Sequence, residues 1–315
     1  MAGTAFQPGY IALYRSGELQ RRARALEARL ARCDICPREC GVDRLRGEEG
    51  WCRSGYLPLV SAVCDHHGEE PPISGTKGSG AIFFGNCTLK CLYCQNHQIS
   101  QDPQRQRGKE ADCLALARHM LHLPEDLRCH NITLGSPSHF VPQIVRALVE
   151  AVPLGLHLPL VYNTNGYDSL ATLRELDGIV DIYLPDLKYA SDTCAMKFSQ
   201  AREYVRHTRA AIAEMHRQVG NLMMDEDGVA RRGLIVRHLI LPNGIAGSEE
   251  SLAWLATALS PEVTVSIMSQ YYPGHRAPRV PLLSRRITPA EHAEVLDLLD
   301  RLGLENGWVQ ELDSA

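Results

Sequence analysis

A regular alternation of short apolar runs and helical segments between residues 81 and 303 constrains the fold more than any other feature of this chain. Six apolar runs of strand length lie at residues 81–86, 130–135, 158–163, 178–185, 233–241 and 263–269. Segments of helical character follow them at residues 111–123, 141–151, 169–176, 199–219, 248–259 and 289–303. Repeated strand and helix units predict right-handed crossovers and a parallel sheet. Six units are too few for the usual closed eight-stranded barrel, so we expect a partial barrel or a doubly wound sheet. In either fold, ligands gather at the C-terminal ends of the strands.

Cysteine is frequent in this chain, and its distribution predicts metal binding rather than disulfides. The count is eleven, an odd number. Seven of these residues form two groups, Cys33, Cys36, Cys40 and Cys52 followed by Cys87, Cys91 and Cys94. In a reducing compartment such groups hold metal more often than they form bridges. The scattered cysteines are expected to be small buried apolar residues; they are Cys64, Cys113, Cys129 and Cys194.

The stretch CTLKCLYC, which carries Cys87, Cys91 and Cys94, begins where the first predicted strand ends. Thiolates suit soft metals and iron–sulfur clusters. A 4Fe–4S cluster held by three cysteines keeps one iron open, as a catalytic metal site keeps a position for its substrate. The alternative is a four-ligand zinc site completed by His97.

The spacing of these three cysteines on the loop after the first strand resembles the signature of the radical S-adenosylmethionine (SAM) superfamily. The resemblance implies that Cys87, Cys91 and Cys94 hold a 4Fe–4S cluster whose fourth iron is chelated by the amino and carboxylate groups of SAM. An electron from the cluster then cleaves SAM to methionine and a 5′-deoxyadenosyl radical, which abstracts hydrogen from a substrate. It also implies that Tyr93 lies beside the adenine.

Longer stretches resemble the pyruvate formate-lyase activating enzymes, in a branch with an additional N-terminal cysteine group. These stretches are CDICPRECG, HHGEEPPISGTKGSGAIFFGNCTLKCLYCQN, VYNTNGYD, DIYLPDLKY, VRHLILPN and SIMSQYYPG. The resemblance implies a partial (β/α)6 parallel barrel, a flavodoxin or ferredoxin as electron donor, and hydrogen abstraction from a glycine Cα of a partner enzyme. One alternative keeps the radical chemistry but directs it at a small molecule or a peptide side chain. Another is a zinc-stabilised binding protein without redox chemistry.

The same resemblance implies a set of SAM-binding residues besides Tyr93. They are Gly135, Ser136, Asn163, Thr164, Asn165, Asp186, Lys188 and Arg237. Two positions depart from the family pattern. Asn163 replaces an acidic residue that relatives link to a monovalent cation, and Gly135-Ser136-Pro137-Ser138 replaces a Gly-Gly-Glu sequence.

The residues before the barrel are expected to form a separate metal-binding segment. We place its boundaries at 1–77 and those of the barrel at 78–315. The four cysteines at positions 33–52 suit structural zinc and an auxiliary iron–sulfur cluster equally well. Residues 65–80 read as an irregular connection. Its charged residues could line the mouth of the active site, although such a loop is more often solvated; they are Asp65, His66, His67, Glu69 and Glu70.

Charge and hydropathy argue against nucleic acid and membrane partners. The formal net charge is −4, so the chain has no bulk attraction for nucleic acid or anionic lipid. Its most apolar stretch, at residues 144–162, is interrupted by charges and prolines. No secretory signal is recognised at the N-terminus, and a cytoplasmic location is expected.

Overall fold

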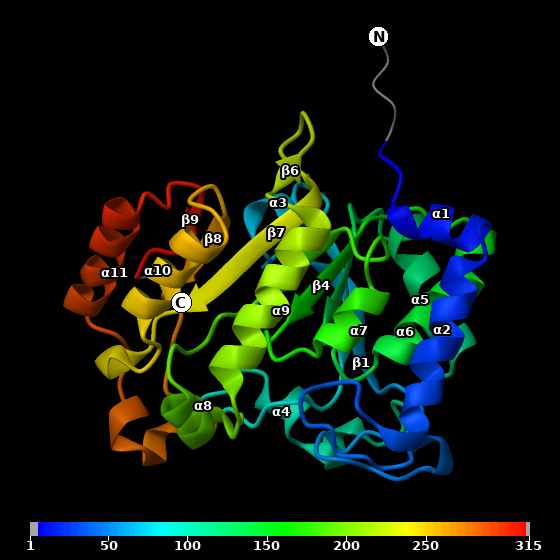
Figure 1. Ribbon diagram of the computed structural model, residues 1–315, viewed down its shortest axis with the longest axis horizontal. Coiled ribbons are helices and arrows are strands. Elements are labelled where there is room, and N and C mark those ends of the chain that lie inside the picture. The colour runs from blue at the N-terminus through cyan, green and yellow to red at the C-terminus, as the bar shows by residue number, and fades with distance from the viewer. Residues whose placement is uncertain (1–5, 313–315) are drawn as a thin grey trace.

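The computed structural model describes residues 6–312, and among them a nine-stranded sheet forms the centre of an α/β fold (Figure 1). Its strand order is β1-β2-β3-β4-β5-β7-β8-β9, with β6 paired to β7. The strands are β1 Val60–His66, β2 Ser79–Phe84, β3 Ile132–Gly135, β4 Leu160–Thr164, β5 Ile182–Pro185, β6 Met223–Met224, β7 Ala230–Leu239, β8 Thr264–Met268 and β9 Gly307–Val309. Neighbouring strands from β2 to β9 along this order are parallel, which confirms the predicted parallel α/β fold.

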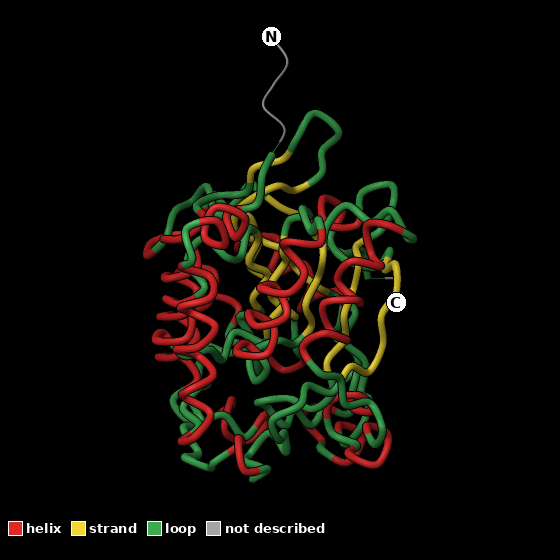
Figure 2. Tube along the Cα trace, turned by 90° about the vertical axis from the view of Figure 1, so that its right-hand side faces the viewer, coloured by secondary structure: helices red, strands yellow, loops and turns green. Residues whose placement is uncertain are grey.

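Helices connect the strands and cover most of them from outside, as Figure 2 shows with several yellow strands in the interior and red helices beside them. The α-helices are α1 Gly9–Arg15, α2 Glu18–Ala28, α3 Pro71–Ser74, α4 His97–Ser100, α5 Cys113–Glu125, α6 Val141–Ala151, α7 Leu170–Glu175, α8 Asp192–Ser199, α9 Tyr204–Val219, α10 Ser248–Ala258 and α11 Pro289–Leu302. Short 3-10 helices are η1 Arg29–Arg32, η2 Arg44–Arg46, η3 Pro103–Gln106, η4 Val152–Leu154, η5 Pro242–Gly244, η6 Ala277–Arg279 and η7 Pro281–Leu283.

The parallel strands follow one another in chain order, so the sheet turns in one direction like part of a barrel. Alternate residues of each strand face opposite sides. Tyr162 and Val236 pack into the large core that the helices cover. Val161 and Ile235, their neighbours in sequence, instead pack with Ile73 in a small cluster on the inner side. The structure therefore has an outer core beneath the helices and an inner face that is free to line a site.

The six strands expected from the sequence correspond to β2, β3, β4, β5, β7 and β8. Residues 222–232 form a hairpin through the antiparallel pairing of β6 with β7. The expectation of an irregular connection over 65–80 holds only in part. Strand β1 extends to His66 and pairs with β2 in antiparallel fashion, and α3 forms within the same stretch.

The N-terminal residues are packed onto the barrel. Leu19 and Leu26 of α2 belong to the same hydrophobic core as Leu148 of α6. The Arg44 side chain is 1% exposed; its Nη1 donates to the His139 carbonyl oxygen at 2.7 Å. The boundary proposed between residues 77 and 78 falls between two strands that pair with each other, β1 and β2. None of the helices within residues 6–312 has the length and hydrophobicity needed to cross a membrane.

Candidate active site

A cavity of about 460 Å³ lies at the C-terminal end of the parallel strands, where Cys87, Cys91 and Cys94 meet the inner face of the sheet. Figure 1 shows this end below the arrowhead of β7, near α4 and α8. Most of the residues expected to bind SAM line the cavity with these cysteines. They are Gly135, Ser136, Asn163, Asn165, Asp186, Lys188 and Arg237. Residues that come from five strand ends are thus brought together as the βα pattern predicts.

Strand parity explains why these polar side chains point inward. Asn163 lies two residues after Val161 on β4, and Arg237 lies two residues after Ile235 on β7. Because Val161 and Ile235 face the inner cluster, Asn163 and Arg237 face the same side. Asp186 follows β5, where Leu184 is the corresponding inward residue. The inner face therefore changes from apolar to polar toward the C-terminal ends of the strands.

Asp186 is the centre of a charged network in the cavity wall. Its carboxylate accepts from Arg237 Nε at 2.8 Å and from Lys188 Nζ at 2.6 Å. Arg237 Nη2 also donates to Asn163 Oδ1 at 2.6 Å. Burial opposes the charge on Asp186, but Arg237 and Lys188 outweigh it and lower the pKa of this carboxyl. The network fixes two cations beside the three cysteines.

Glu69 completes this network; the sequence left open whether it lines the mouth of the site or lies in a solvated loop. It lies in the connection between β1 and α3, and it lines the cavity. Asn163 Nδ2 donates to Glu69 Oε1 at 3.1 Å, and Arg237 Nη1 lies 3.6 Å from Glu69 Oε2. Burial raises the pKa of Glu69 to about 7 although Arg237 opposes the shift. Of the two readings, the lining of the site therefore holds at this residue, whose side chain is 6% exposed, and the solvated loop does not.

The sequence around Glu69, HHGEEPP, explains the burial of this side chain once the fold is known. Prolines at the first helical positions end the extended connection and start α3. Ile73 on α3 then packs into the inner cluster. This anchor directs the preceding glutamate into the barrel, whereas a charged run without an anchored neighbour would remain in solvent.

Each thiol of the CTLKCLYC loop has a polar partner. Asn165 Nδ2 donates to Cys87 Sγ at 3.3 Å, and Ser199 Oγ donates to Cys91 Sγ at 3.0 Å. Cys94 Sγ lies 3.2 Å from Ser100 Oγ. Burial raises the pKa of Cys91 to about 12, with Lys188 opposing the shift, and burial also raises the pKa of Cys94. Metal binding at this loop must therefore release protons.

The donor set fits an iron–sulfur cluster better than a hard cation, because it consists of three soft thiols beside an open cavity. Within residues 6–312, no three side chains of His, Cys, Asp or Glu already converge closely enough to hold a metal ion. The thiols would have to turn toward a common centre on binding. His97, the ligand of the alternative zinc site, does not line the cavity; its ring stacks on His275 with centroids 4.6 Å apart.

Two residues expected at the SAM site lie behind the cavity wall rather than on it. Tyr93 is buried, and its hydroxyl bonds to the Tyr189 hydroxyl at 2.7 Å. Thr164 is buried and donates to Asp168 Oδ2 at 2.5 Å. In this structure both residues support the wall through the side chains and turns that they hold in place.

The N-terminal cysteines lie within electrostatic reach of one another, although the described residues form no ready-made metal site there. Cys33, Cys36 and Cys52 are buried, and Cys40 is half-buried. Burial raises the pKa of Cys36 well above its usual range, and the neighbouring Cys52, Cys33 and Cys40 add to the shift. The backbone N–H of Cys33 donates to the Val42 carbonyl at 2.9 Å, which closes the chain on itself. Four soft thiols from one short segment suit zinc or an iron–sulfur cluster.

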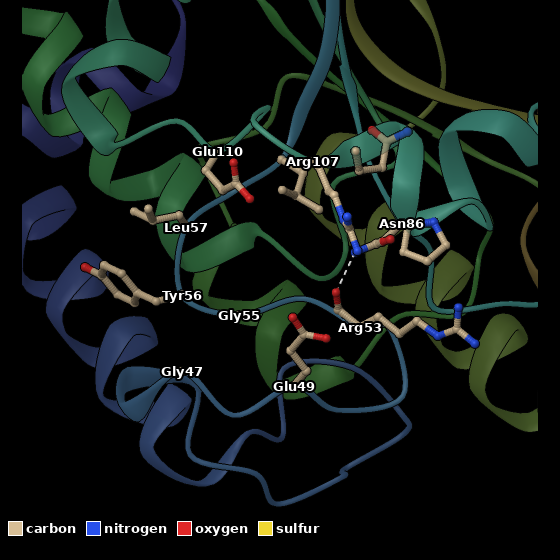
Figure 3. Close-up of a pocket in the computed structure, with 12 residues that line it drawn as sticks. Gly47, Glu49, Arg53, Gly55, Tyr56, Leu57, Asn86, Arg107 and Glu110 are labelled. Carbon is tan, nitrogen blue, oxygen red and sulfur yellow. Dashed lines mark hydrogen bonds between the residues drawn. The ribbon is translucent and has the colours of Figure 1, made fainter.

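A second hollow of about 480 Å³ lies beside the cysteine cavity, between the N-terminal segment and residues 103–110 (Figure 3). Asn86 lines both spaces, and its side-chain Nδ2 donates to the Arg53 carbonyl oxygen at 2.7 Å. Charged side chains of both signs surround this hollow; they are Glu49, Arg53, Arg107 and Glu110. The described residues that line it include no cysteine, so we assign the chemistry to the neighbouring cavity.

Comparison with known proteins finds a family match over part of the chain. Residues 81–231 match the family described as the Radical SAM superfamily. The chain is 28% identical over 278 residues to the uncharacterized protein MJ0674 of Methanocaldococcus jannaschii, covering 87% of this chain and 75% of that protein. It is 25% identical over 163 residues to the uncharacterized protein MJ0808 of the same organism, covering 48% and 41%.

Solved structures with a related arrangement have low sequence identity. SuiB of Streptococcus suis, in a crystal structure bound to S-adenosylmethionine, has a TM-score of 0.43 and 12% identity, covering 72% of this chain and 48% of that chain. Methylornithine synthase (PylB) has a TM-score of 0.42 and 14% identity, covering 73% of this chain and 70% of that chain. The matched part spans about half the length of SuiB.

Proposed function

Because residues 81–231 match the Radical SAM superfamily, we propose that this protein is a radical SAM enzyme that binds its cluster through Cys87, Cys91 and Cys94. A 4Fe–4S cluster with SAM supplies a 5′-deoxyadenosyl radical that abstracts hydrogen from a substrate. One observation carries the proposal above the others. The three thiols and the Asp186 network share a single cavity at the C-terminal ends of the strands.

The charge balance of the cavity wall suits the amino-acid end of SAM. Arg237 and Lys188 are two cations facing one strongly acidic carboxyl, Asp186. When Glu69 holds its proton, one positive charge remains without a counterion in this network. A ligand carboxylate would supply that counterion, and Lys188 can present its ammonium group as a point charge. The amide of Asn163 and the backbone at Gly135 and Ser136 offer further hydrogen-bonding groups on the same wall.

As the substrate we propose a glycine Cα of a partner enzyme, in keeping with the stretches that resemble pyruvate formate-lyase activating enzymes. A glycyl radical is stabilised by its flanking amides, so this transfer is downhill. The hollow beside the cysteine cavity supports a peptide target, because it offers room and charged side chains of both signs next to Asn86. A small molecule is the alternative target. Deuterium transfer from labelled partner protein into 5′-deoxyadenosine would identify the first, and transfer only from small metabolites would reject it.

The remaining parts of the proposal concern metals, reductant and location. We propose that Cys33, Cys36, Cys40 and Cys52 bind zinc or an auxiliary iron–sulfur cluster in a structural role. A flavodoxin or ferredoxin would supply the electron, and the cytoplasm would provide the reducing conditions that thiol ligands need.

The test of the function uses the anaerobically purified protein. We expect bound iron and sulfide, and conversion of SAM to 5′-deoxyadenosine and methionine under dithionite. Cys91→Ala should abolish this conversion, because it removes a thiol from the cavity. The matched control is Cys113→Ala at the start of α5, which should retain it nearly unchanged. Equal loss in both variants, or a colourless protein that contains zinc but no iron, would contradict the proposal.

A further inference from the structure

Arg38 of the N-terminal cysteine segment (residues 33–52) lies against the loop that carries Cys87. Its Nε donates to the Thr88 carbonyl oxygen at 3.0 Å. Thr88 is fully buried, and Asn165 Nδ2 donates both to its hydroxyl, at 2.9 Å, and to Cys87 Sγ, at 3.3 Å. The loop is therefore held from the barrel side by Asn165 and from the N-terminal side by Arg38.

The Arg38 guanidinium makes cation–π contacts with two aromatic rings. Its carbon lies 4.3 Å from the ring centre of Trp51 and 5.2 Å from that of Tyr167. Trp51 directly precedes Cys52, and Arg38 itself follows Cys36 by two residues. Contacts with two rings and the hydrogen bond to Thr88 limit the freedom of the guanidinium and so restrict the directions of its N–H groups.

One nitrogen of this group has no partner in the described structure. Arg38 Nη2 is buried and lacks a hydrogen-bond acceptor. A buried donor without a partner costs about 1–3 kcal/mol, so such a group is rarely left without a function. Burial lowers the pKa of Arg38, while the nearby Tyr167, Cys36 and Cys87 oppose the shift. One cation therefore lies within electrostatic reach of both cysteine groups.

We propose that Arg38 is a positioning residue that couples the N-terminal cysteine segment to the Cys87–Cys94 loop. It holds Thr88 in place, and it directs its free N–H and its positive charge toward the sulfur ligands on the Cys87 side. This inference rests on the proposed function in that the sulfur ligands belong to a bound cluster. Positive charge and N–H donors near cluster sulfurs favour the reduced, more negative state. The N-terminal segment would thus tune the potential at which SAM is cleaved.

The first test measures the midpoint potential of the cluster by titration followed by electron paramagnetic resonance. Arg38→Gln should make the midpoint potential more negative by about 59 mV, which corresponds to about a tenfold change in the equilibrium constant of a one-electron reduction. The midpoint potential of Arg38→Lys should lie between those of Arg38→Gln and the wild type, because lysine keeps the charge but lacks the planar guanidinium group. The control is Arg46→Gln in the same segment, an arginine whose side chain is 85% exposed, which should leave the midpoint unchanged.

The second test needs no cluster and therefore separates this inference from the proposed function. Hydrogen exchange of the metal-free full chain should be faster across residues 86–92 in Arg38→Gln, because the Thr88 contact is lost. Exchange in β8 should not change. Failure of the wild type to bind iron would refute the proposed function, while the exchange result would still decide the coupling. The inference would be overturned if residues 86–92 of Arg38→Gln exchanged hydrogen at the wild-type rate. It would also be overturned if Arg38→Gln bound its cluster with the wild-type midpoint potential.

Discussion

Two buried carboxyl groups, whose pKa values shift in opposite directions, determine the electrostatics of the cavity. Asp186 stays charged because Arg237 and Lys188 both donate to it. Glu69 is buried as well, but its only strong partner is the neutral amide of Asn163, since Arg237 Nη1 lies 3.6 Å away. The same cavity therefore holds one permanent anion and one carboxyl that titrates near neutral pH. Perturbed carboxyls of this kind are frequent at functional sites.

Glu69 makes the stability of the protein depend on pH. Its pKa is raised from 4.5 to about 7, so the folded chain binds a proton that the unfolded chain releases. The resulting stability is fully present below pH 4.5 and is lost as the pH rises through 7. Glu69→Gln should remove this loss and flatten the pH dependence of the free energy of unfolding between pH 5 and 8, by at most about 3 kcal/mol.

Denaturant unfolding at several pH values checks this expectation, with Glu49→Gln, an exposed residue, as the control. Part of the pH dependence of the free energy of unfolding should persist in Glu69→Gln, because burial also raises the pKa of Asp181, at the opposite end of the strands, to about 7. If the free energy of unfolding of Glu69→Gln kept the full wild-type pH dependence, the Glu69 carboxyl would not titrate between pH 5 and 8.

At the scale of elements, the turn after β4 illustrates how backbone geometry places the site. Gly166 has a φ of +77°, a region that side chains disfavour. A Cβ atom at this position would also overlap the carbonyl oxygen of Asp186. The turn therefore brings β4 and the end of β5 close enough for Asn165 to reach the Cys87 loop. The Thr-Asn-Gly sequence is explained by this approach of two backbones.

Gly166→Ala should destabilise the protein by more than the cost of a left-handed residue alone. The control is Gly228→Ala in the hairpin between β6 and β7, where φ is +73° and no atom lies within 4 Å of the added Cβ. The control should lose about 1–2 kcal/mol from backbone strain. Gly166→Ala should lose several kcal/mol, because the Asp186 carbonyl must move. Thermal unfolding of the two variants compares their stabilities directly. Equal losses of stability would mean that the close approach of Gly166 to the Asp186 carbonyl oxygen does not affect stability.

The elements that sequence reasoning missed share a physical cause. Strand β9 has only three residues, and β1 ends in polar residues and has β2 as its one strand partner. Neither shows the continuous apolar run of a strand buried on both faces. In contrast, α11 carries its own local signals. Thr288 and Glu291 form a capping box, Pro289 occupies the first helical position, and Gly303 closes the helix.

At the scale of the whole molecule, the N-terminal residues and the barrel share one core. Leu26 is fully buried on α2 and belongs to the cluster that also contains Leu148 and Leu134. Arg38 and Arg44 add polar contacts to the barrel at Thr88 and His139. The N-terminal part is therefore built into the barrel rather than attached by a linker.

Leu26→Ala tests this integration. It should lower the free energy of unfolding of the whole protein by about 2–5 kcal/mol, as a core cavity does. The far-UV circular dichroism, which reports mainly on the barrel helices, and the fluorescence of Trp51 in a variant without the other tryptophans should shift together. Leu154→Ala, at a residue that is 65% exposed, should change neither. A shift of the Trp51 signal alone would indicate an independently folding segment.

The sequence by itself determined the parallel α/β architecture, the placement of the three-cysteine loop at a strand end, and the grouping of the other cysteines. These features depend on short-range periodicity and on residues close together in the chain. Only the tertiary structure decided which further residues join the cavity network and which expected residues lie behind its wall. It brought Glu69 to Asn163, 94 residues later, and Arg38 to Thr88, and it set Tyr93 and Thr164 behind the wall. Such contacts join segments that are distant in sequence. They are set by strand parity and packing inside the barrel, which no local pattern encodes.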